Sequence, residues 1–182
     1  VRFLRVCGDL KRVQRTGWVN NRVPSPESVA DHSFRMAMAA FLVRDPGVDR
    51  EKLMKICLVH DLAEAIVGDL APNSGVSKQE KHRLELDAMQ RICAELEDEA
   101  IGGEILGLWR EYEEQSSPEA RIAKQLDKLE MIVQADEYEE QHGLALQEFF
   151  DSTAEEFRHP EVLSWAAKLR EERHQRTAAA AE

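Results

Sequence analysis

The sequence has little cysteine, a deficit of positive charge and no long hydrophobic run. Three cysteines occur among 182 residues, an odd number at wide spacing, which excludes a disulfide-rich scaffold and a zinc knuckle. The apolar runs are too short to span a bilayer, and no secretory signal peptide is visible. We therefore expect no membrane partner and a cytoplasmic or nuclear location, although a start at Val1 rather than Met leaves open a removed targeting segment.

The charge balance argues against one class of partner. The chain has 24 basic and 35 acidic residues, a net charge of -11, and its longest basic tract is Lys81–Arg83. Such a surface repels the phosphate backbone of DNA or RNA. No polymeric nucleic acid partner is expected.

The sequence lacks the sustained alternation of apolar and polar residues that strands need, and its apolar positions recur at three and four residues. This pattern predicts an all-α fold, with one compact domain over residues 1–176 and a disordered tail over 177–182. With 43% hydrophobic residues the domain can bury a sizeable core. We expect about six main helices plus short C-terminal ones: 1–15, 28–44, 49–68, 77–96, one after an interruption at Gly102-Gly103, 118–143, and short helices after a capping box at 152–155 and after Pro160.

Four side chains from three separate segments form a candidate metal site. They are His32, the adjacent pair His60 and Asp61, and Asp127. Two imidazoles and two carboxylates suit one divalent cation such as Mn, Co, Fe or Zn. Four protein ligands leave room on such an ion for water and substrate.

A buried histidine or aspartate on its own is usually a hydrogen-bonded structural residue. Here the positions of the residues in the sequence argue for metal binding. The pair His60-Asp61 lies in the most hydrophobic predicted helix, where an unpaired carboxylate is costly to bury. Asp127 lies beside the apolar stripe of its own predicted helix, so it too needs a cation.

The chain resembles the HD-domain metal-dependent phosphohydrolases, which are named for a tandem His-Asp pair with a distant upstream His and downstream Asp. Further motifs resemble the 5'-deoxynucleotidase branch of that family, and the resemblance covers nearly the whole chain. It implies a helical HD domain, a homodimer, and hydrolysis of deoxyribonucleoside 5'-monophosphates to deoxynucleoside and phosphate. The motifs are Arg15–Trp18, Pro26–His32, His60–Asp69, Glu80–Arg83 and Lys124–Asp127.

Two acidic residues are the catalytic candidates. Glu64 follows His60 by four residues, so the two share one face of the predicted helix and Glu64 is the candidate acid/base. Asp69 follows Gly68, where that helix should stop, and by resemblance meets the sugar of the substrate. The same two carboxylates are candidates for holding a second, weakly bound Mg.

Arg15, Trp18 and Asp69 are the substrate-binding candidates. The forked guanidinium of Arg15 suits a phosphate. The bacterial pattern has Arg directly before the tryptophan, whereas this chain has Gly17, so Arg22 is the alternative phosphate contact. Trp18 is predicted either to form a pocket wall or to be an ordinary core residue.

Two other functions are compatible with parts of the pattern. One is an HD-type phosphodiesterase or nucleotide pyrophosphohydrolase, but dinuclear phosphodiesterases need further histidines, and His82 is the only one between Asp61 and Asp127. The other is a non-catalytic helical interaction protein. Loss of a metal ligand would favour that alternative, and all four are present.

Overall fold

The computed structural model describes residues 1–71 and 75–179. Within those residues the chain forms ten helices and no β-strand, so the all-α prediction is confirmed. No helix of the described part has the length and apolar character needed to cross a membrane. The helices are α1 (Arg2–Asp9), α2 (Thr16–Asn20), α3 (Val29–Ala40), α4 (Arg50–Val59), α5 (Glu64–Val67), α6 (Lys78–Ala94), α7 (Glu99–Glu114), α8 (Pro118–His142), α9 (Gln147–Asp151) and α10 (Pro160–Ala179).

The longest helix, α8, begins and ends where the sequence predicts. The side chain of Ser117 accepts a hydrogen bond from the backbone N–H of Ala120, and Pro118 occupies the first helical position. Gly143 closes the helix at a left-handed φ of 65°. These caps fix the register of α8 and therefore the direction in which Asp127 points.

The first helix is shorter than the predicted 1–15, because the chain after it pairs with the segment that precedes α3. The N–H of Val29 donates to the carbonyl of Val13 at 2.9 Å, and the N–H of Arg15 donates to the carbonyl of Glu27 at 3.2 Å. This pairing outweighs the local preference for helix. It also holds Arg15 beside the start of α3.

The helix predicted over 49–68 is broken in two. It starts at the predicted N-cap, Asp49, but α4 ends at Val59, and a run of tight turns leads into α5. In an unbroken helix adjacent side chains diverge by about 100°. The turns instead let His60 and Asp61 face the same centre. No glycine or proline marks this break, so packing in the folded chain produces it.

The glycine pair predicted to precede the fifth helix lies inside it. Asp98 caps α7 by accepting hydrogen bonds from the backbone N–H groups of Ala100 and Ile101, which starts the helix before Gly102 and Gly103. Gly102 allows a close approach, because a Cβ there would lie 3.1 Å from the carbonyl oxygen of Cys93 in α6. The pair is therefore a packing feature and not a helix breaker.

Two C-terminal predictions are also wrong. The predicted capping box at 152–155 opens no helix, since α9 precedes it and the chain forms turns there. The last helix, α10, is long rather than short and continues through Thr177–Ala179, part of the predicted disordered tail. Alanine has the highest helix propensity, which accounts for the extension. Residues 180–182 of that tail lie outside the described residues.

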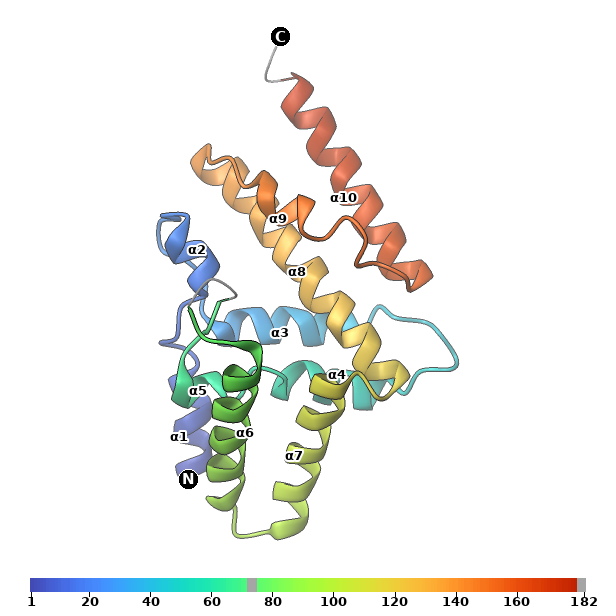
Figure 1. Cartoon of the computed structure of the whole chain (residues 1–182). Coiled ribbons are helices and arrows are strands. Elements are labelled where there is room, and N and C mark those ends of the chain that lie inside the picture. Colours follow the sequence, from blue (N-terminus) through green and yellow to red (C-terminus); the bar gives the residue numbers. More distant parts are fainter. Residues whose placement is uncertain (72–74, 180–182) are drawn as a thin grey trace.

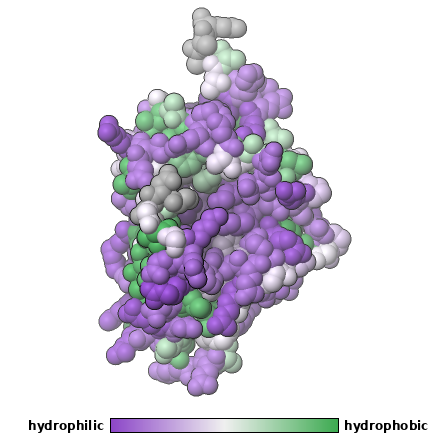
Figure 2. Space-filling model, in the orientation of Figure 1, coloured by the Kyte–Doolittle hydropathy of each residue, from purple (hydrophilic) through white to green (hydrophobic). Residues whose placement is uncertain are grey.

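Buried apolar residues form two clusters. The larger contains residues of α3, α4 and α8 with the C-terminal segments. The smaller contains residues of α6, of α7 and of the turns after α4, and partly buried residues of α1 pack against it. Figure 1 shows α8 lying across α3 and α4, with the α6–α7 hairpin extending on the opposite side of that layer. On the face seen in Figure 2 hydrophilic residues predominate. The elements that carry the predicted ligands thus meet in the interior of the molecule.

Candidate metal centre

His32 is fully buried on α3, one turn after Ser28, the N-cap of the helix. Its Nδ1 is hydrogen-bonded to Oε2 of Glu130 on α8. Its Nε2 is buried and has no hydrogen-bond partner among the described residues. Buried polar atoms are nearly always paired, so the unpartnered Nε2 is a candidate metal donor.

His60, at the C-cap position of α4, also has a hydrogen-bonded Nδ1 and, among the described residues, an unpartnered Nε2. Its Nδ1 lies 2.8 Å from the carbonyl oxygen of Cys57, which can only accept, so Nδ1 carries the proton and Nε2 presents a lone pair. Nε2 of His60 is also buried and unpartnered within the described part of the chain. The two rings lie edge to face, with 5.4 Å between their centroids for His32 and His60.

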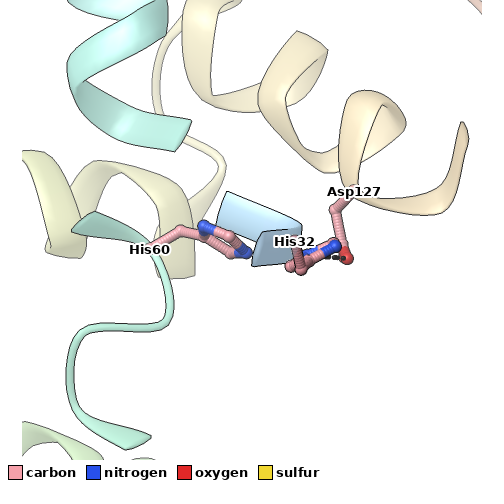
Figure 3. A group of neighbouring side chains, drawn as sticks. All are labelled: His32, His60 and Asp127. Carbon is pink, nitrogen blue, oxygen red and sulfur yellow. Dashed lines mark ion pairs between the residues drawn. The ribbon is translucent and has the colours of Figure 1, made fainter. Parts of the chain in front are cut away.

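Asp127 on α8 completes the group drawn in Figure 3. Its Oδ1 lies 3.4 Å from Nε2 of His32, and its Oδ2 accepts a hydrogen bond from the hydroxyl of Tyr112 at 3.1 Å. One ligand atom each of His32, His60 and Asp127 lies within 4.8 Å of the others. The expectation that Asp127 points inward is therefore confirmed.

Asp61 lies at the edge of the same group. Its Oδ2 is 3.0 Å from Nε2 of His60 and 3.9 Å from Nε2 of His32. Burial alone would raise the pKa of Asp61, but the neighbouring His60 and the guanidinium of Arg15 hold it below its ordinary value. Asp61 is thus an ionised carboxylate placed against both unpartnered imidazole nitrogens.

These donors fit one divalent cation. Two unpartnered imidazole nitrogens and two carboxylates converge from three elements, and a dication would satisfy the nitrogens and balance the two negative charges. The set contains nitrogen and oxygen but no thiolate, which suits borderline or fairly hard metals.

Glu64 is buried close by but is carried by a different helix from the predicted one. It begins α5, after the break, so it does not share a continuous helix face with His60, and that part of the prediction is wrong. Its Oε2 has no hydrogen-bond partner among the described residues. Burial raises the pKa of Glu64 well above its ordinary value, and the charges of Asp61 and Asp69 raise it further. Glu64 can therefore hold a proton at pH values where Asp61 has lost its own.

Of the two candidate arginines, Arg15 lies at the centre. One guanidinium nitrogen is 3.3 Å from Oδ2 of Asp61, and another is 3.8 Å from Oδ1 of Asp127. Only 14% of the Arg15 side chain is exposed. Arg22, by contrast, is exposed after α2. The guanidinium of Arg15 thus lies beside two of the predicted metal ligands, and its contact with the substrate phosphate stays a prediction.

Asp69 follows Gly68, where the helix ends as predicted; the φ of Gly68 is 75°. One carboxylate oxygen of Asp69 accepts a hydrogen bond from the backbone N–H of Thr16 at 2.6 Å, and its carbonyl accepts one from the hydroxyl of Thr16 at 2.7 Å. The ammonium of Lys81 donates to the carbonyl of the next residue at 3.0 Å. Asp69 therefore fixes the start of α2, directly after Arg15.

Residues 7–163 match the HD domain family. The chain belongs to that family. It is 54% identical over 184 residues to 5'-deoxynucleotidase HDDC2 of Danio rerio, an alignment covering 100% of this chain and 92% of that protein. It is 49% identical over 183 residues to 5'-deoxynucleotidase HDDC2 of Homo sapiens, covering 100% of this chain and 89% of that protein.

A solved structure from the archaea has the same fold. The PH0347 protein of Pyrococcus horikoshii superposes with a TM-score of 0.76 at 34% identity, covering 92% of this chain and 98% of that one. Membership of the HD domain family agrees with a His–Asp group that is able to bind a divalent metal.

Within this HD domain the structure favours the core alternative for Trp18. The residue is 1% exposed, its indole N–H donates to a carboxylate oxygen of Glu27 at 2.9 Å, and its ring packs against Tyr138 and Phe149. It holds α2 to α8 and offers almost no surface to a small molecule.

Two residues that support the ligands are not among the predicted site residues. Glu130 lies one turn after Asp127 on α8 and is hydrogen-bonded to His32. Tyr112 lies on α7, and its hydroxyl donates a hydrogen bond to Asp127. The three-residue spacing of Glu130 from Asp127 places both on one face of a helix, so the sequence could have indicated Glu130. The contact of Tyr112 depends on how α7 packs on α8.

Proposed function

We propose that this HD-domain chain is a metal-dependent 5'-deoxynucleotidase, which hydrolyses deoxyribonucleoside 5'-monophosphates to deoxynucleoside and phosphate. The observation that carries the proposal is the convergence of two buried, unpartnered imidazole nitrogens on ionised carboxylates. The full-length similarity to relatives named 5'-deoxynucleotidase supports the choice of substrate.

His32, His60, Asp61 and Asp127 would hold one divalent ion, which we propose to be Co, Mn, Fe or Zn. When bound, such an ion supplies Lewis acidity toward a phosphoryl oxygen and toward water. Glu64 and Asp69 are the proposed carboxylates that would hold a second, weakly bound Mg through water. Both imidazoles must be neutral to serve as ligands, and their Nδ1 contacts orient their Nε2 lone pairs toward the centre.

Glu64 is the proposed acid/base. Its raised pKa means that its carboxyl can carry a proton and release it to the 5'-oxygen of the departing deoxynucleoside as the phosphorus–oxygen bond breaks. Burial excludes bulk water from this carboxyl and so favours its protonated form.

Arg15 is the proposed contact for the substrate phosphate, because its fork of donors already lies beside two of the ligands. Asp69 is the proposed contact for the sugar. One of its carboxylate oxygens is bound to the backbone of Thr16, which fixes the orientation of the other. That oxygen would accept a hydrogen bond from a 3'-hydroxyl and crowd a 2'-hydroxyl.

A substrate panel tests this proposal against its competitors. Purified protein loaded with Co²⁺ should release phosphate from dAMP faster than from AMP, and should leave a cyclic nucleotide and guanosine tetraphosphate uncleaved. Cleavage of either of the last two in preference to dAMP would favour a phosphodiesterase or pyrophosphohydrolase. Cleavage of none of the four compounds would favour the non-catalytic interaction protein.

We also propose a homodimer, formed through α3. Phe34, Met38 and Phe41 are 64%, 48% and 54% exposed and recur at four and three residues, so they form one stripe. Monomers rarely expose contiguous apolar patches, and a stripe that repeats on an identical copy suits a two-fold contact. A cytoplasmic location belongs to the same proposal, because three free cysteines and a nucleotide substrate suit a reducing compartment.

A further inference from the structure

A buried chain of polar contacts continues behind His32, on the side away from the metal centre. Oε2 of Glu130 is hydrogen-bonded to Nδ1 of His32, and Oε1 of Glu130 accepts a hydrogen bond from Nε of Arg35 at 2.8 Å. The side chain of Glu130 is 2% exposed and that of His32 is 0% exposed. Both oxygens of this carboxylate are therefore committed, one to the imidazole and one to the guanidinium.

Arg35 is itself held by three acceptors on one face of α8. Its two terminal nitrogens donate to Oε1 of Gln134 at 2.6 Å and to Oε2 of Glu137 at 2.8 Å, in addition to the Glu130 contact. His32 and Arg35 lie one turn apart on α3, and their partners lie on successive turns of α8. The contact between the two helices thus determines where Glu130 points.

This arrangement limits the ways in which His32 can be oriented. A carboxylate can only accept, so Glu130 requires the proton of the imidazole to be on Nδ1, which leaves the Nε2 lone pair facing His60 and Asp127. A negative partner at Nδ1 also makes the imidazole a better electron donor. Without Arg35, Glu130 would be a buried charge with no cation paired to its second oxygen.

We propose that Glu130 and Arg35 are positioning residues, which fix the tautomer and orientation of His32 and so set the affinity of the centre for its divalent ion. The inference rests on the metal site of the proposed function. The competing explanation is a buried ion pair that only joins α3 to α8 and contributes stability without affecting metal binding.

Direct titration of the full chain with Co²⁺ separates these explanations. Binding is followed by calorimetry and by the visible absorption of the bound ion, neither of which requires turnover. Glu130→Ala should weaken Co²⁺ binding by roughly 10- to 100-fold and alter the absorption spectrum, and Arg35→Met should do so to a smaller extent. Glu130→Gln has a single amide oxygen, which can accept from Nδ1 of His32 or from Arg35 but not from both, so its Co²⁺ affinity should lie between those of Glu130→Ala and the unmodified chain.

Glu137→Gln is the matched control. Glu137 contacts the same guanidinium but has no contact with His32, and its side chain is 42% exposed, so its loss should leave Co²⁺ affinity unchanged. Circular dichroism on each variant checks folding, and Glu130→Gln keeps the test decisive if Glu130→Ala does not fold. Equal dissociation constants and spectra for Glu130→Ala and the unmodified chain would overturn the positioning role alone. Failure of the unmodified chain to bind Co²⁺ would overturn both this inference and the proposed function.

Discussion

Asp127 and Glu64 are two buried carboxyls whose surroundings push their pKa values in opposite directions. Burial alone would raise the pKa of Asp127, but the ammonium groups of Lys128 and Lys124 and the neighbouring His32 hold it well below its ordinary value. Burial and like charges raise the pKa of Glu64. Pairs of this kind divide naturally into a residue that stays charged and one that carries a proton.

The first prediction follows from that division. Asp127→Ala removes a charged oxygen from the proposed ligands, so both bound metal and turnover should be lost. Glu64→Ala should keep its metal and its fold, while turnover falls by roughly 10²- to 10⁴-fold, the usual contribution of proton transfer. Metal analysis and steady-state kinetics on the two purified variants measure this. An Asp127→Ala protein with stoichiometric metal, or a fully active Glu64→Ala protein, would mean that the roles are assigned to the wrong carboxyls.

A second prediction concerns stability and pH. The pKa of Glu64 in the folded chain is well above its ordinary value of 4.5. At any pH between the unfolded-state pKa and the folded-state pKa, the folded state therefore binds more protons than the unfolded state. Stability contributed by this group is therefore lost as pH rises. Glu64→Gln, which cannot ionise, should raise the melting temperature of the chelator-treated protein near neutral pH and have little effect below pH 4.5. Thermal unfolding at both pH values checks this, and a gain that is the same at both would contradict it.

At the residue scale, the sequence predicts His32, His60, Asp61 and Asp127 as ligands, because their motif spacing is specific and their side chains would be costly to bury without a cation. The structure brings these four side chains close together. The sequence was not sufficient for the partners of those residues. Tyr112 reaches Asp127 through the packing of α7 against α8, which no local pattern encodes.

At the scale of helices, the two glycines of α7 give a matched pair for a third prediction. A Cβ on Gly103 would meet nothing within 4 Å, so Gly103→Ala should stabilise the fold by about 1 kcal/mol, the difference in helix propensity. A Cβ on Gly102 would lie 3.1 Å from the backbone oxygen of Cys93, so Gly102→Ala should lose that gain and destabilise the chain by roughly 1 kcal/mol. Urea unfolding of both variants measures the difference. Equal stabilisation by both would show that α6 and α7 are not closely packed there.

A fourth prediction tests the exposed stripe of α3. Phe34→Glu combined with Met38→Glu places like charges on both sides of a two-fold contact, so the double variant should be monomeric while the unmodified chain is a dimer. The control is Leu163→Glu on α10, where an apolar residue 49% exposed lies outside the stripe, and it should remain dimeric. Light scattering coupled to size-exclusion chromatography measures all three. A monomeric unmodified chain would remove the proposed dimer.

The helices that the sequence predicted best are those with strong caps. Ser117, Pro118 and Gly143 delimit α8 through local backbone chemistry, which a sequence displays directly. The break between α4 and α5 was missed because it carries no glycine or proline, and it follows from the packing of distant segments.

At the scale of the whole molecule, folding brings together groups from α3, from the turns after α4 and from α8 (Figures 1 and 3). The all-α class could be predicted from periodicity, and the convergence of the ligands from the family resemblance. The distances could not, because they depend on how α8 lies across the other two helices. Although the net charge of the chain is -11, Arg15 and Lys81 provide positive charge at the site for an anionic substrate.

The most direct test of the central claim is phosphate release from dAMP and AMP by the whole chain, before and after removal of metal. Chelator-treated protein should be inactive, because two imidazoles and two carboxylates without a cation cannot polarise a phosphoryl oxygen. Co²⁺ or Mn²⁺ should restore hydrolysis better than Mg²⁺, which binds imidazole nitrogen poorly, and dAMP should be cleaved faster than AMP. Full activity in metal-free protein would contradict the metal-dependent mechanism, and equal rates on dAMP and AMP would leave a phosphatase but not a deoxynucleotidase.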